Sequence, residues 1–145
     1  MELAACDLKP VTFFHMRRIL VIDDEETIRE ACARILSRDK WSVVSMESGI
    51  EGLAEIGKDP NGFDAVLLDQ LMPGMSGMEA MNQIRSINPN LPVIIMTGSV
   101  TEDSAYEIVE QGASGCLPKP FTPDELRAAV KKALPAAQPI SFCAE

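Results

Sequence analysis

The sequence predicts an α/β domain in which helices cover both faces of a parallel sheet. Five short apolar runs rich in valine, isoleucine and leucine recur along the chain, and amphipathic stretches with well-marked starts separate them. Short runs with little polar alternation are typical of strands buried on both faces of a parallel sheet. Strands that alternate with helices in this order form parallel sheets with right-handed crossovers.

The apolar runs themselves are the expected strands. Each is too short for an ordinary helix and lies close to turn residues. In chain order the expected strands are 18–23, 41–46, 63–69, 91–97 and a weaker run at 114–118.

Capping motifs predict where the helices between these strands begin. Four Ser/Thr-x-x-Glu boxes follow the second to fifth strands, and in each the hydroxyl can accept from a free backbone N–H while the glutamate reaches back. Pro123 suits the first helical position, where a missing N–H is harmless. The first helix is expected to begin near 24–26, where the helix dipole favours acidic side chains. The four boxes are Ser48 with Glu51, Ser76 with Glu79, Ser99 with Glu102, and Thr122 with Glu125.

The two ends of the chain lie outside this repeat. Residues 1–15 show no periodicity and are interpreted as an N-terminal extension, so the predicted domain is 16–134. Residues 135–145 are interpreted as a C-terminal tail or the start of a linker. We expect no output domain in this chain, because none fits in a tail of that length.

Composition limits the classes of function. Apolar residues make up 46% and charged residues 24% of the 145, which is typical of a globular protein. No run approaches the roughly 20 apolar residues of a membrane span, and no secretory signal is present, so we expect a cytoplasmic protein without membrane contact. The net charge of −9 argues against direct binding of nucleic acid. Four scattered cysteines and one histidine do not make a zinc site.

Polar side chains follow the predicted strands where ligands bind in such sheets, beyond the carboxyl ends. Asp23 and Asp24 follow the first strand, Asp69 ends the third, Thr97 ends the fourth and Lys119 follows the fifth. Three close carboxylates raise one another's pKa unless a cation neutralises them. Mg²⁺ (or Mn²⁺) suits them, since it accepts a few carboxylates and retains water positions for a phosphate oxygen. A carboxylate can itself accept a phosphoryl group.

Four motifs, in this order and spacing, closely resemble the receiver domain of bacterial response regulators. The resemblance covers about 17–134 and implies a flavodoxin-like (βα)5 fold, a doubly wound five-stranded parallel sheet with strand order 2-1-3-4-5. The motifs are Ile-Asp-Asp-Glu at 22–25, Leu-Leu-Asp-Gln-Leu-Met-Pro-Gly-Met-Ser-Gly at 67–77, Ile-Met-Thr-Gly at 95–98 and Leu-Pro-Lys-Pro-Phe at 117–121.

The resemblance also implies a role for each residue at the strand ends. Asp69 would be the phosphoacceptor, and the backbone carbonyl of Leu71 would bind Mg²⁺ together with Asp69, Asp23 and Asp24. Thr97 would move toward the phosphoryl group and Lys119 would pair with it, held by a cis peptide to Pro120.

The implied partners are a histidine kinase or a histidine phosphotransfer protein as donor, and an unknown downstream protein as target. The signal would be a changed protein–protein interaction, without enzymatic turnover of a separate substrate. The resemblance also allows a homodimer through the face of the fourth helix, fifth strand and fifth helix.

Cys116 departs from the family pattern. Receivers commonly carry tyrosine or phenylalanine three residues before the lysine, and that aromatic ring turns inward when the threonine moves. A thiol is much smaller and cannot make the same rotamer switch.

Three other interpretations of these residues differ in the chemistry or the context that they require. A haloacid-dehalogenase-like phosphatase would need a second aspartate as acid and base two residues after its nucleophile, where this chain has Leu71. A flavodoxin-like nucleotide or flavin binder would cradle phosphate in its first loop, which here is Asp-Asp-Glu-Glu at 23–26. The third interpretation, which stays open, is the receiver part of a longer protein such as a DNA-binding regulator or a hybrid kinase.

Overall fold

The computed structural model describes residues 16–98 and 101–135. The predicted N-terminal extension and the predicted tail beyond residue 135 lie outside the described residues. So does Ser99, one of the four predicted caps.

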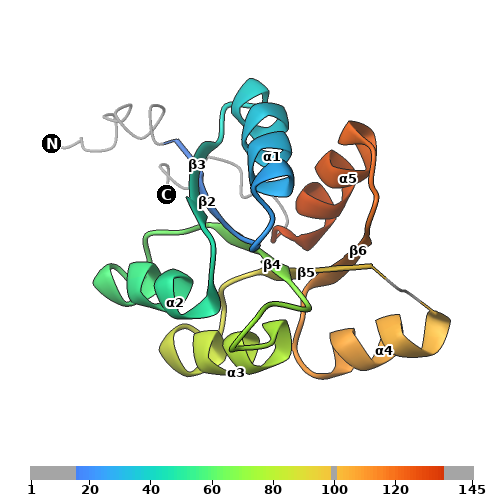
Figure 1. Cartoon of the computed structure of the whole chain (residues 1–145). Coiled ribbons are helices and arrows are strands. Elements are labelled where there is room, and N and C mark those ends of the chain that lie inside the picture. Colours follow the sequence, from blue (N-terminus) through green and yellow to red (C-terminus); the bar gives the residue numbers. More distant parts are fainter. Residues whose placement is uncertain (1–15, 99–100, 136–145) are drawn as a thin grey trace, which may run out of the picture.

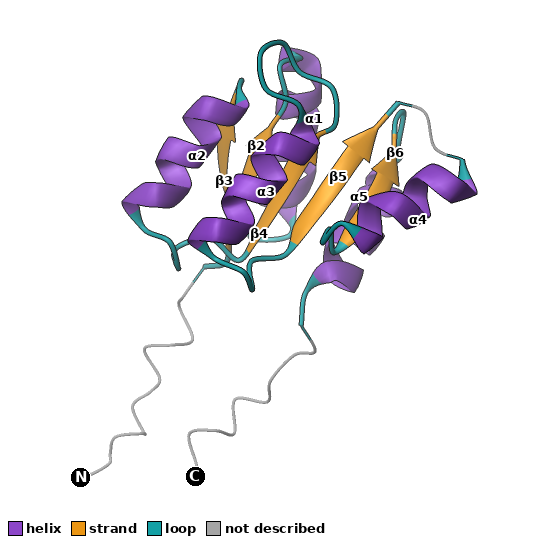
Figure 2. Cartoon of the chain, turned by 90° about the horizontal axis from the view of Figure 1, so that it is seen from below, coloured by secondary structure: helices purple, strands orange, loops and turns teal. Residues whose placement is uncertain are grey.

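Five parallel strands form one sheet, and helices cover both of its faces (Figure 1). All the strand arrows point the same way (Figure 2), and neighbouring strands pair in parallel register. The order across the sheet is β3-β2-β4-β5-β6, which is 2-1-3-4-5 when the strands are counted along the chain. The predicted fold class and strand order are therefore confirmed. The strands are β2 (Arg18–Ile22), β3 (Ser42–Met46), β4 (Ala65–Asp69), β5 (Val93–Thr97) and β6 (Gly115–Pro118).

Every predicted apolar run contains a strand, but four of the strands begin one or two residues later than predicted. Phe63 and Leu91, at the starts of two runs, are buried outside the strands and pack in the core instead. Pro92 lacks the N–H that a sheet ladder requires, so β5 begins only at Val93.

The helices divide between the two faces of the sheet (Figure 1). Side chains alternate along each strand, so that β2 sends Ile19 and Val21 to one face and Leu20 and Ile22 to the other. We call these the α1–α5 face and the α2–α4 face. The first is covered by α1 (Glu26–Arg38) and α5 (Pro123–Ala133), and the second by α2 (Gly49–Lys58), α3 (Gly77–Ile87) and α4 (Glu102–Glu110).

Two of the four predicted capping boxes are present in full. The hydroxyls of Ser76 and Thr122 each accept from the backbone N–H of the glutamate at the third helical position. The carboxylate of that glutamate accepts in turn from the N–H of the capping residue. Ser48 accepts from Glu51 N–H at 3.2 Å, but the Glu51 carboxylate accepts from the N–H of Glu47 instead.

The box predicted for Ser99 and Glu102 is wrong. Helix α4 begins at Glu102 itself, and Thr101 caps it in a reciprocal pair with Ser104. The Thr101 hydroxyl accepts from Ser104 N–H at 3.1 Å, and Ser104 Oγ accepts from Thr101 N–H at 2.9 Å. Serine thus takes the place that the box template reserves for glutamate.

Removing this cap should weaken α4. We expect Thr101→Ala to lower the free energy of unfolding by about 1 kcal/mol, because the Ser104 N–H in the first turn loses its acceptor. Thr101→Ser keeps the hydroxyl and should remain within about 0.5 kcal/mol of the wild type. Urea denaturation of the three proteins measures the difference, and equal losses in both variants would contradict the assignment of the cap.

Among the described residues, no helix is long and apolar enough to cross a membrane.

Candidate functional site

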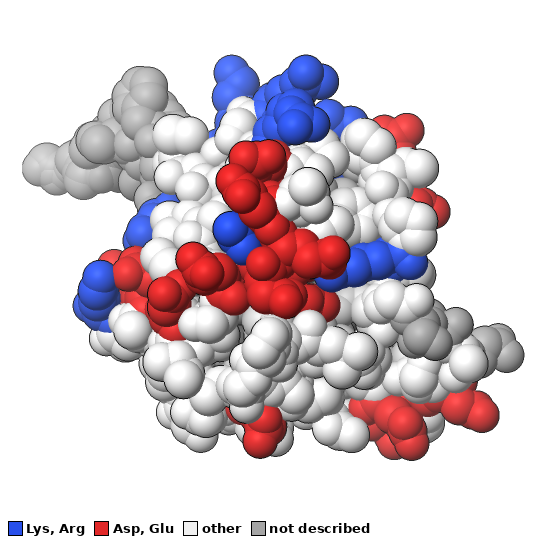
Figure 3. All heavy atoms as spheres, viewed as in Figure 1, with Lys and Arg blue, Asp and Glu red and all other residues white. Residues whose placement is uncertain are grey.

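The predicted site residues meet at the carboxyl edge of the sheet. Figure 3 shows acidic side chains gathered in a continuous group near the middle of the face that Figure 1 views. Because β2 and β4 are adjacent and parallel, the residues that end them lie side by side. Asp69 is the last residue of β4, and Asp23 and Asp24 come directly after β2.

The three aspartates form a compact cluster. One carboxylate oxygen of each lies within 4.8 Å of the others. Asp23 is fully buried and Asp69 is 5% exposed, whereas Asp24 is exposed. The Asp23 N–H donates to Met46 O at 3.1 Å, and Asp23 Oδ1 accepts from Glu25 N–H at 2.9 Å. These bonds fix the first loop with its carboxylates facing Asp69.

Lys119 places its ammonium among these carboxylates. Its Nζ lies 2.8 Å from Asp23 Oδ2, 3.2 Å from Asp69 Oδ1 and 3.2 Å from Glu25 Oε1. The Lys119 N–H donates to Thr97 O at 2.7 Å, which continues the sheet ladder to the lysine, and the Lys119–Pro120 peptide is cis. The side chain is only 14% exposed, so its charge acts in a poorly solvated setting.

Burial and charge shift the pKa values of this cluster in a consistent way. Burial raises the pKa of Asp69 from 3.8 to about 6, the Asp23 charge adds to the rise, and Lys119 opposes it. Burial alone would lower the pKa of Lys119, but its contacts with Asp23 and Asp69 outweigh burial and raise it. The ammonium therefore stays charged at neutral pH, and the Asp69 carboxylate is ionised there at a cost in stability.

The raised pKa of Asp69 yields a prediction about stability without metal. A folded-state pKa above the unfolded value gives stability that is present below pH 4 and is lost as the pH rises through about 6. At pH 7.5 in EDTA we therefore expect Asp69→Asn to be more stable than the wild type by about 1–3 kcal/mol. Urea denaturation at pH 7.5 and pH 5 checks this, since the gain should shrink at the lower pH. An asparagine variant that is less stable at pH 7.5 would contradict the prediction.

The donor set suits a hard divalent cation. Asp23 Oδ2 is buried and lies 2.8 Å from the Lys119 ammonium. This single positive charge balances only part of the negative charge of the three carboxylates, and unbalanced charge is costly in a buried site. The cluster offers three carboxylate ligands, and its exposed member, Asp24, leaves solvent access for the waters that Mg²⁺ usually keeps.

Thr97 and Gln70 lie beside this cluster. Thr97 ends β5 and is 1% exposed, and its hydroxyl donates to Gln70 Oε1 at 2.5 Å. Gln70 directly follows Asp69, and its N–H donates to Met96 O at 2.8 Å. The pattern of polar residues at the strand ends pointed to Thr97 but not to Gln70, although the register of β4 and β5 makes the two residues neighbours.

Three further residues at this site were not singled out from the sequence. Glu25 pairs with the Lys119 ammonium, and Arg29 Nη1 in α1 donates to Asp23 O at 2.7 Å. Gly77 N–H donates to Gln70 O at 2.8 Å. A Cβ atom added to Gly77 would lie 2.3 Å from Asp69 O. The only sequence signal for Glu25 and Arg29 was their place in the first loop and the first turn of α1.

Leu71 and Cys116 lie at the margins of the site. The Leu71 side chain is 75% exposed in the loop after β4. Cys116 lies in β6, opposite Ile95, and packs partly against the α2–α4 core. It lines a cavity of about 280 Å³ between α4, β6 and α5, at the position where the family pattern has an aromatic ring. Burial raises the pKa of its thiol, which makes it a poor nucleophile.

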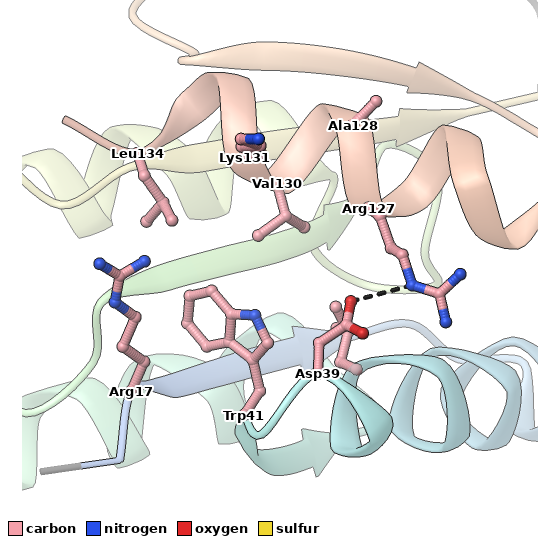
Figure 4. Close-up of a pocket in the computed structure, with 9 residues that line it drawn as sticks. Arg17, Asp39, Trp41, Arg127, Ala128, Val130, Lys131 and Leu134 are labelled. Atoms are coloured by element: carbon pink, nitrogen blue, oxygen red, sulfur yellow. Dashed lines mark hydrogen bonds and ion pairs between the residues drawn. The ribbon is translucent and has the colours of Figure 1, made fainter. Parts of the chain in front are cut away.

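A separate cavity of about 480 Å³ lies between α1 and α5 (Figure 4). The Asp39–Arg127 ion pair, at 2.9 Å, closes one side of it, and Trp41 points into it. Arg17 precedes β2 and Asp39 caps the C-terminus of α1, so this cavity is at the amino edge of the sheet. It is therefore at the opposite edge from the aspartate cluster. Its lining residues are Arg17, Leu36, Asp39, Trp41, Arg127, Ala128, Val130, Lys131 and Leu134.

Comparison with known proteins gives one consistent family. The family model for the response regulator receiver domain matches residues 19–131. Response regulator MprA of Mycobacterium sp. (strain KMS) is 37% identical over 84% of this chain and 52% of its own length. MprA of Mycobacterium leprae (strain TN) is 34% identical over 84% and 53%. The chain thus spans about half the length of the curated relatives it matches.

Solved structures agree with this family and fold. A receiver domain protein from Clostridium thermocellum is 37% identical, with a TM-score of 0.76 over 81% of this chain and 94% of that one. The chemotaxis response regulator CheY4 of Vibrio cholerae is 30% identical, with a TM-score of 0.77 over 83% and 100%. The chain therefore belongs to the response regulator receiver domain family of two-component systems.

Proposed function

We propose that the chain accepts a phosphoryl group on Asp69 from a phosphohistidine donor, with Mg²⁺ bound beside it. The proposal rests chiefly on one observation. The buried Asp69 carboxylate ends a strand 3.2 Å from the Lys119 ammonium, and the carboxylates of Asp23 and Asp24 lie within 4.8 Å. A nucleophile, a fixed positive charge and a set of metal ligands in one crevice are what phosphoryl transfer needs, since positioning and charge neutralisation dominate its catalysis.

In the proposed reaction, an ionised Asp69 oxygen attacks phosphorus. The new P–O bond forms as the P–N bond of the phosphohistidine breaks, and the bonding electrons leave with the imidazole nitrogen. Lys119 would balance the negative charge on the phosphoryl oxygens and on Asp69. The Thr97 hydroxyl would donate a hydrogen bond to a phosphoryl oxygen once the group is attached.

Asp23, Asp24 and Asp69 would hold the cation, with the Leu71 carbonyl as the fourth proposed protein ligand. When bound, Mg²⁺ supplies positive charge that offsets repulsion between the carboxylates and the incoming phosphoryl oxygens. A neighbouring cation also favours the ionised form of Asp69, which counteracts the raised pKa of the metal-free carboxyl.

Receiver domains interact with histidine kinases and with downstream targets. For this chain we propose a histidine kinase or a histidine phosphotransfer protein as donor, and a changed protein–protein contact in the cytoplasm as output. The face of α4, β6 and α5 is the proposed dimer surface, where Tyr106 and Val109 of α4 are 66% and 49% exposed. We propose an acceptor that does not turn over a separate substrate.

The test is Mg²⁺-dependent labelling by a small phosphodonor. The purified chain and Asp69→Asn are incubated with acetyl phosphate, with and without Mg²⁺, and intact mass is followed over time. We expect a single phosphoryl adduct on the wild type only, and only with Mg²⁺. Matching circular dichroism spectra would show that the variant is folded.

Two outcomes would contradict the proposal. A folded wild type without an adduct under any condition would leave only a structural resemblance. An adduct that persists in Asp69→Asn would place the acceptor elsewhere. Steady release of phosphate from small phosphate esters would favour the phosphatase alternative, for which Leu71 offers no acid–base group.

A further inference from the structure

The alternation of side chains places the two halves of the site on opposite faces of the sheet. Asp69 follows Leu67 by two positions and Lys119 follows Leu117 by two, and both leucines pack on the α1–α5 face. Thr97 follows Ile95 and Gln70 follows Leu68, and that isoleucine and leucine pack on the α2–α4 face. The sheet hydrogen bonds continue past the strand ends to Gln70 and Lys119, so the alternation holds for these two residues as well. Gln70 N–H donates to Met96 O, and Lys119 N–H donates to Thr97 O.

The hydrogen bond between Thr97 and Gln70 therefore holds the threonine hydroxyl on the α2–α4 face. The Thr97 hydroxyl carries one proton, and this proton is donated to Gln70 Oε1 at 2.5 Å. Thr97 is 1% exposed, so bulk water is not at hand to replace that acceptor. A buried hydroxyl that leaves a hydrogen bond must find another, because an unsatisfied polar group is expensive in the interior.

A phosphoryl group on Asp69 would be that other acceptor. For Thr97 to donate to a phosphoryl oxygen, its side chain must rotate about χ1 and leave Gln70. Threonine is β-branched and occupies discrete χ1 rotamers, so this exchange is a step between two states rather than a gradual shift.

We propose that Gln70 is a positioning residue that restrains Thr97 in the unphosphorylated state and releases it when Asp69 carries the phosphoryl group. This inference rests on the proposed function for its second state, whereas its first state concerns the unmodified protein alone. Breaking the bond frees the Gln70 amide on the α2–α4 face, the face on which Cys116 also packs. The restraint thus gives this chain a link between the acceptor and that face that does not need an aromatic ring at position 116.

The test removes the acceptor and keeps the side-chain volume. In Gln70→Met, the Thr97 methyl group is expected to report averaging between χ1 rotamers, measured by three-bond NMR couplings in the unphosphorylated protein. The wild type should show one rotamer, and Gln70→Glu, which keeps an oxygen at the same reach, should restore it. Gln111→Met, at the exposed C-cap of α4, is the matched control and should leave the couplings unchanged.

The same variants carry a kinetic prediction. Gln70→Met should raise the Mg²⁺-dependent rate of phosphorylation by acetyl phosphate about two- to tenfold, the factor that one net hydrogen bond corresponds to. In a Thr97→Val background Gln70→Met should change the rate less than twofold, because the restrained hydroxyl is already gone.

The outcomes separate this inference from the proposed function. Unchanged Thr97 couplings in Gln70→Met would overturn the restraint, whether or not the protein can be phosphorylated. Equal rate changes in the threonine and valine backgrounds would also overturn it. Absence of any adduct on the wild type would instead overturn the proposed function and with it the release step. The Thr97 couplings in the unphosphorylated protein would still show whether Gln70 restrains Thr97.

Discussion

Loss of the Lys119 ammonium is expected to have the largest effect of any single substitution outside the aspartates. Lys119→Met keeps an unbranched chain of similar length but removes the charge that lies 2.8 Å from Asp23 and 3.2 Å from Asp69. We expect the Mg²⁺-dependent rate of phosphorylation by acetyl phosphate to fall at least about tenfold, and as much as about a thousandfold. Removing a preorganised charge-stabilising group from a buried site has effects of that order.

The same substitution should destabilise the metal-free protein. Asp23 is fully buried and Asp69 nearly so, and without the lysine their charges have no cation among the described contacts of the two side chains. Breaking a buried ion pair by removing one partner costs about 3–5 kcal/mol. Part of that loss should be recovered in Mg²⁺, since a cation that binds only the folded state stabilises it. Urea denaturation with and without Mg²⁺ measures both parts.

Lys58→Met is the matched control for Lys119→Met. Lys58 pairs with Glu55 on the exposed side of α2, with 71% of its side chain exposed. A surface pair of this kind contributes little, so we expect a loss below about 0.5 kcal/mol and an unchanged rate of phosphorylation. If Lys119→Met were labelled as fast as the wild type, the lysine would have no role in neutralising the transferred group.

The difference between what the sequence predicted and what it missed has a physical origin. Asp23, Asp69, Thr97 and Lys119 could be predicted as neighbours because each ends or follows a strand, and parallel strands end at one edge. That inference needs only the backbone. The strand order needed more than the alternation of elements, and it came from the resemblance of the motifs.

Contacts that depend on rotamers were the ones missed. The Glu25–Lys119 ion pair joins residues 94 positions apart, and no local pattern encodes it. The bond between Thr97 and Gln70 follows from register once the strand pairing is known, but the register is a property of the folded sheet. The error at Ser99 is local, since Thr101 and Ser104 make a reciprocal cap without the glutamate that the template requires.

Gly77 gives the second large prediction, because helix propensity and steric fit predict opposite signs there. Gly77 is the first residue of α3, where alanine is the better helix former. An added Cβ would lie 2.3 Å from Asp69 O and 2.8 Å from Gln70 Cα, both of them backbone atoms that cannot turn aside. We expect Gly77→Ala to lower the free energy of unfolding by about 1–3 kcal/mol, the usual cost of overpacking.

The displaced backbone is that of the acceptor, so the effect should extend to chemistry. If the Asp69 carbonyl moves to relieve the contact, the carboxylate moves with it, and a shift of about 1 Å at a reacting group can cost about a hundredfold in rate. Labelling by acetyl phosphate with Mg²⁺ should therefore be slower in Gly77→Ala by at least about tenfold. The measurement is made below the unfolding transition, so that a loss of folded protein does not account for it.

Gly57→Ala separates crowding from the loss of glycine as such. Gly57 lies in α2, and a Cβ there would meet nothing within 4 Å. We expect this variant to gain up to about 1 kcal/mol, because alanine favours the helix and no contact opposes it. It should be labelled at the wild-type rate. If the free energy of unfolding rises in Gly57→Ala and falls in Gly77→Ala, then helix propensity does not explain the glycine at the start of α3. The close approach of α3 to the Asp69 backbone would explain it. A stabilised and fully active Gly77→Ala would show that the loop after β4 can yield without moving the acceptor.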